Sequence, residues 1–209
     1  MSWIVVSYFT DNSPYPEHAT HLIRSLRSFN LPYEVTPMKD LGDWQKNTQF
    51  KATFLQQKLK RFRPHSLVCV DCDAVFYRYP DYFDKLDIDP SVNIAVHVLD
   101  HSKYSRRNHP PELLSGTIFL RNTPTTSIIV NAWIAACRKS PMLWDQRALA
   151  SVLQNFPYHQ LPAEYCTIFD LMKSVQNPVI KHFQASREVR RAKKNSPKTN
   201  QVFVVKRKK

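Results

Sequence analysis

The sequence predicts an α/β fold, a single domain in which helices flank a mostly parallel sheet. Strand-like and helix-like patterns alternate from residue 2 to residue 76. The segment Leu67–Val70 is apolar and β-branched, as expected for a strand that is buried on both faces. A chain of 209 residues, 43% of them hydrophobic, is also long enough to enclose one core.

A strand, a helix and another strand begin the chain. The predicted strands are Ser2–Phe9 and the shorter Pro32–Pro37. Tyr15–Phe29 lies between them and has a helical pattern. Its apolar residues fall on one helical face: Ala19, Leu22, Ile23, Leu26 and Phe29.

A second helix leads into the buried segment Leu67–Val70. It begins near Asp43–Asn47, and Pro64 ends it because proline disfavours helical backbone in the preceding residue. Its buried stripe consists of Phe50, Phe54, Leu55, Leu59 and Phe62. The order strand–helix–strand–helix–strand is typical of a parallel sheet with right-handed crossovers.

The remaining elements are shorter. We expect a short helix or turn at Pro80–Leu86, helices around Ile128–Ala136 and Asp145–Phe156, and strands at Val92–Leu99, Leu113–Leu120, Tyr158–Leu161 and Val179–His182. We divide the chain into a domain at residues 1–187 and a basic C-terminal tail at residues 188–209, in which Val202–Val205 could form a small edge strand.

Composition excludes several classes of protein. The chain has only two glycines, so it holds neither a GxGxxG fingerprint nor a Walker loop. No apolar run approaches the roughly 18 residues of a membrane helix, and the N-terminus has the pattern of a strand, not of a signal peptide. Four cysteines without a second metal-binding pair favour buried free thiols over a zinc site. We therefore expect a cytoplasmic protein, and leave its oligomeric state open.

The net charge of +13 is concentrated at the C-terminus. From Lys181 to Lys209 there are eleven Lys or Arg and one acid, so ten of the thirteen net positive charges lie there. Such a tail favours nucleic acid, an anionic surface, or simply solubility.

Two carboxylates one residue apart, Asp71 and Asp73, directly follow the buried segment Leu67–Val70. In α/β sheets, ligands bind beyond the carboxyl ends of the strands. Paired acids there can hold a divalent metal that bridges a diphosphate. The alternative is a strand that ends in an ordinary polar turn.

The order of further motifs resembles the GT-A-type glycosyltransferases of the nucleotide-diphospho-sugar transferase superfamily. The likeness covers nearly all of residues 2–187, and the short chain is most similar to small phage or bacterial members. Six segments carry it: Tyr8-Phe9-Thr10, Trp44 and Asn47 ahead of Lys51, Asp71-Cys72-Asp73, Ser115-Gly116-Thr117, Trp144-Asp145-Gln146 and His182–Arg187.

The resemblance implies a GT-A (Rossmann-like) fold and a metal site for Mn²⁺ or Mg²⁺. In similar enzymes the second acid of the Asp-x-Asp motif binds the metal and the first reaches ribose or the metal, which assigns these roles to Asp73 and Asp71. In glycogenin-like members a late histidine completes the metal sphere, which points to His182. A purely structural histidine is the alternative.

The resemblance also implies a nucleotide-diphospho-sugar donor, with a UDP-sugar expected. Lys51 and Arg187 are candidates for binding the diphosphate, and Arg suits phosphate oxygens. A solvated helix position is the alternative for Lys51. The other donor-binding candidates are Tyr8, Thr10, Asn12, Ser115, Gly116 and Gln146. Tyr8 also fits an ordinary core position, and Ser115-Gly116 also fits a β-bulge.

Asp145 is the second candidate catalytic residue, besides Asp73. It could be the general base of an inverting reaction or could orient donor hydroxyls in a retaining one. An ordinary helix N-cap is the alternative.

The acceptor is the least defined part. The segment His101–His109 carries Lys103, Arg106, Arg107 and Tyr104, and together with the basic tail it suggests an anionic acceptor. A hydroxylated base in phage DNA, flipped out of the duplex, would fit. A glycan, protein or small-molecule acceptor and a loop that closes over the donor are alternatives. So is a non-catalytic nucleic-acid-binding protein of this fold. A nucleotidyltransferase would need a Gly-rich loop after the first strand, which this chain lacks.

Overall fold

The computed structural model describes residues 2–12, 14–104 and 108–188. Its strands are β1 (Trp3–Thr10), β2 (Tyr33–Met38), β3 (Ser66–Val70), β4 (Ala74–Phe76), β5 (Ile94–Leu99), β6 (Glu112–Leu120), β7 (His159–Gln160), β8 (Thr167–Ile168) and β9 (Ile180–His182). Its helices are α1 (Tyr15–Ser28), α2 (Trp44–Arg61), α3 (Tyr82–Ile88), α4 (Pro124–Lys139) and α5 (Asp145–Leu153), with 3₁₀ turns η1 (His101–Tyr104) and η2 (Ala163–Tyr165).

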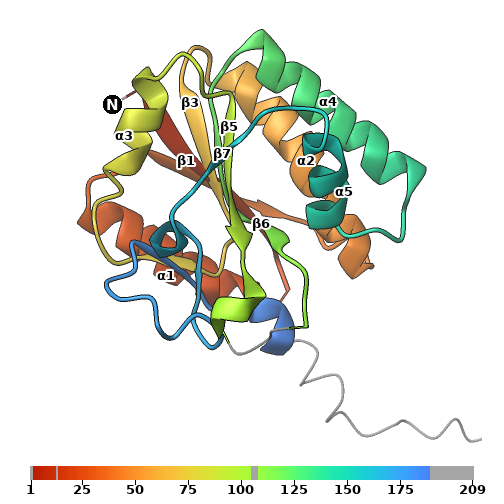
Figure 1. Cartoon of the computed structure of the whole chain (residues 1–209). Helices are drawn as coiled ribbons and strands as arrows, with labels where there is room; N and C mark the ends of the chain where they lie inside the picture. The colour runs from red at the N-terminus through yellow and green to blue at the C-terminus, as the bar shows by residue number, and fades with distance from the viewer. Residues whose placement is uncertain (1, 13, 105–107, 189–209) are drawn as a thin grey trace, which may run out of the picture.

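A six-stranded sheet in the order β2-β1-β3-β6-β5-β7 forms the centre of the molecule (Figure 1). β1 pairs in parallel with β2 and with β3, which confirms the predicted strand–helix–strand–helix–strand unit. β6 runs antiparallel to both β3 and β5, while β7 is parallel to β5. The sheet is therefore mixed but mostly parallel, as predicted.

Helices cover both faces of this sheet (Figure 1). One core lies under α2, α4 and α5, and another lies under α1 and α3. Alternation along β3 supplies both cores, because Leu67 and Cys69 pack into the first and Val68 and Val70 into the second. All of β3 is buried, which explains its unbroken apolar sequence.

A small second sheet, in the order β4-β9-β8, lies beyond the carboxyl end of β3. β4 pairs antiparallel with β9, so that Ala74 lies opposite His182, and β8 adds to β9 in parallel. β9 was among the predicted strands, whereas β4 and β8 were not, because these two short strands form by pairing with β9. This sheet fixes His182 beside the acid motif.

Several predictions concern residues outside the described ranges. These are the strand at Val202–Val205, the basic residues Arg106 and Arg107, and all of the tail except Glu188. The four cysteines are buried free thiols, as expected. Within the described ranges, the helices fall short of the length and apolarity that a membrane span requires.

Candidate active site

A pocket of about 440 Å³ opens beyond the carboxyl ends of β1 and β3. Its wall includes Thr10 from β1, Lys51 from α2, the acids Asp71 and Asp73, and Asp145 from α5. Ligand sites in open α/β sheets lie at this edge. The sequence therefore brings its acid motif to the expected place, and the volume is within the range of small-molecule sites.

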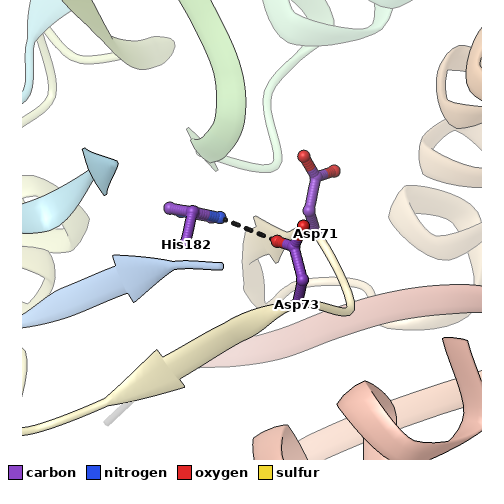
Figure 2. Close-up of side chains that lie close together, drawn as sticks. All are labelled: Asp71, Asp73 and His182. Atoms are coloured by element: carbon purple, nitrogen blue, oxygen red, sulfur yellow. Dashed lines mark hydrogen bonds and ion pairs between the residues drawn. The ribbon is translucent and has the colours of Figure 1, made fainter. Parts of the chain in front are cut away.

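Asp71, Asp73 and His182 form a compact cluster in this region, with one ligand atom from each lying within 4.8 Å of the others. Figure 2 shows Asp73 and His182 pointing toward one another, with Asp71 beside Asp73. The distance from His182 Nδ1 to Asp73 Oδ1 is 3.4 Å, and His182 Nε2 lies 2.8 Å from the hydroxyl of Thr117. The backbone N–H of Ala185 donates to Asp73 Oδ2 at 2.9 Å. Both side chains are thus held in place.

Burial and neighbouring groups act in opposite directions on the pKa values of the three residues in the cluster. Burial by itself lowers the pKa of His182, but the Cys166 thiol and the Asp73 carboxylate outweigh it and raise that pKa to about 10. Burial raises the pKa of Asp73, but the hydrogen bond and the charge of His182 outweigh it and hold that pKa below its usual value. For Asp71, the loss of hydration prevails over the attraction of Lys51 and raises the pKa.

The cluster fits a divalent cation. Two carboxylates and one imidazole can together hold a divalent cation, and a bound ion would take the place of the proton on His182. Gly116 leaves the necessary room, because a Cβ there would lie 3.2 Å from His182 Cε1, 3.3 Å from His182 Nδ1 and 3.5 Å from Asp71 Oδ2. A side chain at this position would intrude between two of the ligands.

Lys51 is buried beneath the pocket, not solvated on the helix surface as the alternative had it. Its Nζ lies 2.6 Å from Asp71 Oδ1, 3.3 Å from Asp145 Oδ2 and 3.0 Å from the carbonyl oxygen of Ser115. Burial lowers the pKa of Lys51, but the charges of Asp71 and Asp145 outweigh it and raise that pKa well above its usual value. A permanent cation therefore joins the acid motif to α5.

Asp145 does not cap α5, so the N-cap alternative is wrong. Trp144 is the N-cap residue, and Asp145 is the first residue of the helix. Its buried carboxylate accepts a hydrogen bond from the Ser115 hydroxyl at 3.0 Å and pairs with Lys51. The carboxylate is thus directed toward the pocket wall, where these two partners fix its orientation.

The Ser115–Thr117 segment is a bulge, and it also approaches the acid motif. β5 shifts its register on β6 between Val96 and His97, so these residues have no partner on β5. On the other side, the backbone N–H of Asp71 donates to the Gly116 carbonyl at 2.9 Å. The bulge brings β6 against the cluster.

A family model of nucleotide-diphospho-sugar transferases matches residues 42–201, which is most of the chain. This chain is a nucleotide-diphospho-sugar transferase. Such enzymes move a sugar from a nucleotide-diphospho-sugar, so the transferase is an enzyme and not merely a nucleic-acid-binding module. The matched range contains both acids, His182 and Asp145.

Solved structures agree on a GT-A-type fold. The transferase is similar to a glycosyltransferase involved in glycosylation of the major capsid of PBCV-1, with a TM-score of 0.71 and 12% identity over 93% of this chain and 98% of that one. It is also similar to the galactosyltransferase LgtC in complex with donor and acceptor sugar analogues, with a TM-score of 0.56 and 9% identity over 94% of this chain and 98% of the other. Glycosyltransferase GlyE of Streptococcus pneumoniae TIGR4 gives a TM-score of 0.59 and 12% identity over 86% of this chain and 54% of its own. No curated protein sequence matches the transferase.

The predicted nucleotide-side residues divide into two groups. Tyr8 and Thr10 line the pocket, but Asn12 lies outside its lining and donates to Asp40 Oδ2 at 2.7 Å. Tyr8 is both a core and a pocket residue, since its ring packs on Phe50 and its hydroxyl donates to the Asn47 carbonyl at 2.8 Å. Burial raises the pKa of Tyr8 well above its usual value, more than Lys51 lowers it, so the phenol stays neutral.

Arg187 and Gln146 both line the pocket of the transferase. Arg187 is ion-paired with Asp170, so a phosphate would have to share or displace that partner. Gln146 accepts from the Ser115 N–H at 3.1 Å and donates to Glu112 Oε1 at 2.7 Å.

Sequence reasoning missed two parts of the pocket wall. One is the pair of tryptophans, Trp44 and Trp144, whose rings meet edge to face at 5.4 Å. Both belong to motifs that carried the resemblance, which is the sequence signal that could have found them, and Trp144 is 39% exposed. The other is Glu112. Its only sequence signal is its position, as an acid directly before an apolar strand pattern.

Proposed function

We propose that the protein is a metal-dependent glycosyltransferase that moves a sugar from a nucleotide-diphospho-sugar, a UDP-sugar in our expectation, to a hydroxyl acceptor. The observation that carries this proposal is the cluster of Asp71, Asp73 and His182 beside the pocket. Family membership supports the donor class.

Asp73 and His182 would hold Mn²⁺ or Mg²⁺, and Asp71 would complete the set. When bound, the ion supplies positive charge that stabilises the departing diphosphate. Two observations support this role for Asp73. Its lowered pKa keeps the carboxylate ionised, and the Ala185 N–H orients it.

Asp145 orients hydroxyl groups of the donor sugar in this proposal. Its carboxylate already accepts hydrogen bonds from Ser115 and lies 3.3 Å from Lys51. These two protein partners fix the orientation of the carboxylate. We therefore prefer the orienting role over the general-base role.

The remaining pocket residues bind the other parts of the donor. Tyr8 and Thr10, at the end of β1, are assigned to the base and ribose, and Arg187 to the diphosphate. Lys51 positions Asp71 and Asp145, and because it lines the pocket it is assigned to the diphosphate together with Arg187. Ser115 and Gln146 shape the wall, and Gly116 provides space.

A hydroxylated base in DNA is the second candidate acceptor. The nine Lys and Arg of residues 189–209 favour it. The PBCV-1 neighbour is involved in glycosylation of the major capsid, which favours an acceptor on protein or glycan instead. Buried free thiols are typical of a reducing compartment and support the proposed cytoplasmic site of action.

A screen of nucleotide-sugars tests the proposed function. Thermal shift and slow donor hydrolysis are measured with Mn²⁺, with Mg²⁺ and with EDTA, since a ligand of the folded state raises its apparent stability. We expect metal-dependent binding of one donor class, and its loss in Asp73→Asn. Asp89→Asn is the matched control, because the Asp89 carboxylate bonds locally to Ser91 and lies outside the lining of both pockets. A panel without metal-dependent binding or turnover contradicts the proposal.

A further inference from the structure

A second pocket, of about 360 Å³, borders the first. His101, Glu112 and Gln146 line both, so the two spaces meet at these side chains. The rest of the second wall includes Pro110, Pro111 and Arg147. Its size is within the range of small-molecule sites. A transferase needs two substrates side by side, and the second pocket lies next to the one that contains the acids.

Glu112 stands at the junction of the two pockets in a fixed orientation. Its Oε2 lies 3.0 Å from His101 Nε2, and its Oε1 accepts from Gln146 Nε2 at 2.7 Å. Yet 37% of the Glu112 side chain is exposed, so the carboxylate is held by two partners and still open to a ligand. Each carboxylate oxygen retains capacity to accept another hydrogen bond.

His101 provides a second observation at the same place. Its side chain is 7% exposed, and Nδ1 has no hydrogen-bond partner among the described residues. The ring of His109 lies 5.3 Å away and borders only the second pocket. A buried nitrogen without a partner is uncommon in a folded protein, and it is often explained by function.

A hydrogen-bonded chain connects this junction to the donor side. Gln146 Oε1 accepts from the Ser115 N–H at 3.1 Å, and the Ser115 hydroxyl donates to Asp145 Oδ2 at 3.0 Å. Asp145 in turn pairs with Lys51. Glu112 is thus positioned by the same side chains that border the proposed donor site.

The second pocket offers both a hydrogen-bond acceptor and a hydrogen-bond donor, because Glu112 and Arg147 line it. Its carboxylate accepts hydrogen bonds, and the guanidinium of Arg147 lies over the Trp144 ring at 5.3 Å. A sugar hydroxyl can both donate and accept, whereas a phosphodiester only accepts and its negative charge would face the Glu112 carboxylate. The exposed Trp144 lines the first pocket and contacts Arg147 of the second wall, and its ring is of the kind that sugar rings contact.

We propose that the second pocket is the acceptor subsite, that its acceptor is a sugar residue, and that Glu112 binds the acceptor hydroxyl. This inference rests on the proposed function for the meaning of "acceptor". The binding site itself exists independently of the donor.

The test measures sugar binding directly. Methyl glycosides of glucose, galactose and mannose are titrated into the full chain, and NMR follows the side-chain amide of Gln146 and the indole N–H of Trp144. At least one glycoside shifts these signals saturably. Glu112→Gln weakens its binding by about tenfold, the effect of losing one charge-assisted hydrogen bond. Glu17→Gln, at an exposed position on α1 outside both pockets, binds like the original chain.

A second variant guards against a folding artefact. Ala150→Leu adds bulk to the wall of the second pocket on a helix that tolerates leucine, and it weakens glycoside binding without altering Glu112. Equal glycoside affinity in Glu112→Gln, or no glycoside response in the original chain, overturns the inference. A response to a duplex with hydroxymethylcytosine and to none of the sugars overturns the sugar class in favour of DNA.

A parallel titration with UDP and Mn²⁺ separates the two proposals. Its failure counts against the proposed function, while the glycoside result still decides the second pocket.

Discussion

Gly116 lies against the cluster of Asp71, Asp73 and His182, and its lack of a side chain leaves room there. Replacing it by alanine places a Cβ 3.3 Å from His182 Nδ1 and 3.5 Å from Asp71 Oδ2. The neighbours must yield by a few tenths of an ångström, so we expect Gly116→Ala to lower Mn²⁺ affinity by about tenfold or more, as displaced ligand supports do. Isothermal titration with Mn²⁺ measures this.

Gly42→Ala is the contrasting control. Gly42 has φ +78°, where an L side chain is strained, but no atom lies within 4 Å of its would-be Cβ. This variant loses about 1 kcal/mol of stability while keeping its Mn²⁺ affinity. Equal Mn²⁺ affinity in both variants would show that Gly116 does not make room for an ion.

His182 gives the metal-free protein a pH dependence. Its pKa rises from 6.5 in the unfolded chain to about 10 in the folded one. A raised pKa stabilises the fold fully below 6.5, and this stabilisation is lost as the pH rises toward 10. In EDTA, the free energy of unfolding therefore falls with pH by at most about 1.4 kcal/mol per pH unit, the value for one proton.

Urea unfolding at neutral pH and at about pH 8.5 checks this prediction. His182→Gln should flatten the slope relative to the original chain, because the other titrating groups are common to both. An equal slope in the two proteins would contradict it. Since an ion must displace the proton of His182, Mn²⁺ affinity should rise over the same pH range.

The place of a single residue could be predicted where a sequence pattern beside it identified a secondary-structure element. Asp71 and Asp73 followed an unmistakable buried strand, so their place at the sheet edge could be inferred from it. Lys51 could not be placed, because a lysine beside an apolar stripe has the same pattern whether it is solvated or buried against acids. Its burial depends on Asp71 and Asp145, which are far away in the sequence.

At the scale of elements, β6 builds the back of the cluster. The bulge at Ser115–Thr117 brings the hydroxyl of Thr117 within 2.8 Å of His182 Nε2. This contact orients the imidazole, as outer partners of metal ligands generally do. β4 and β9 fix the other side, because Ala74 pairs with His182. The sequence was compatible with a bulge at Ser115-Gly116 and predicted β9, but it did not predict β4 or these contacts, because they depend on pairing with distant segments.

Thr117→Val tests the contribution of β6. It removes the hydroxyl but keeps the shape, and we expect the Mn²⁺ affinity to fall by about tenfold. Thr167→Val on β8 is the matched control, since that buried hydroxyl donates to the Ala163 carbonyl at 2.9 Å, whereas the His182 ring bonds to Thr117. Both variants lose about 1 kcal/mol of stability, measured by urea unfolding. A fall in metal affinity shared by both would point to general loosening instead.

At the scale of the whole molecule, the fold was predictable because its pattern is repeated over long elements. Strands and helices from β1 to β3 are long and strongly periodic, and the parallel pairing follows from their order. The antiparallel insertion of β6 between β3 and β5 depends on which strands meet in space. The periodicity of one strand cannot contain that information.

The distribution of charge leads to the last prediction. Residues 189–209 contain nine Lys or Arg and no acid, so a chain that ends at Glu188 has a net charge of +4 instead of +13. If DNA binding comes from this tail, its affinity falls steeply with salt, and removing the tail abolishes most of that salt dependence. Fluorescence anisotropy with a labelled duplex over a range of salt concentrations measures both. Metal-dependent donor hydrolysis should persist, because the cluster and both pockets lie within residues 2–188. Salt-dependent DNA binding that survives the deletion would place the nucleic-acid surface on the domain, and would weaken the case for a sugar acceptor in the second pocket.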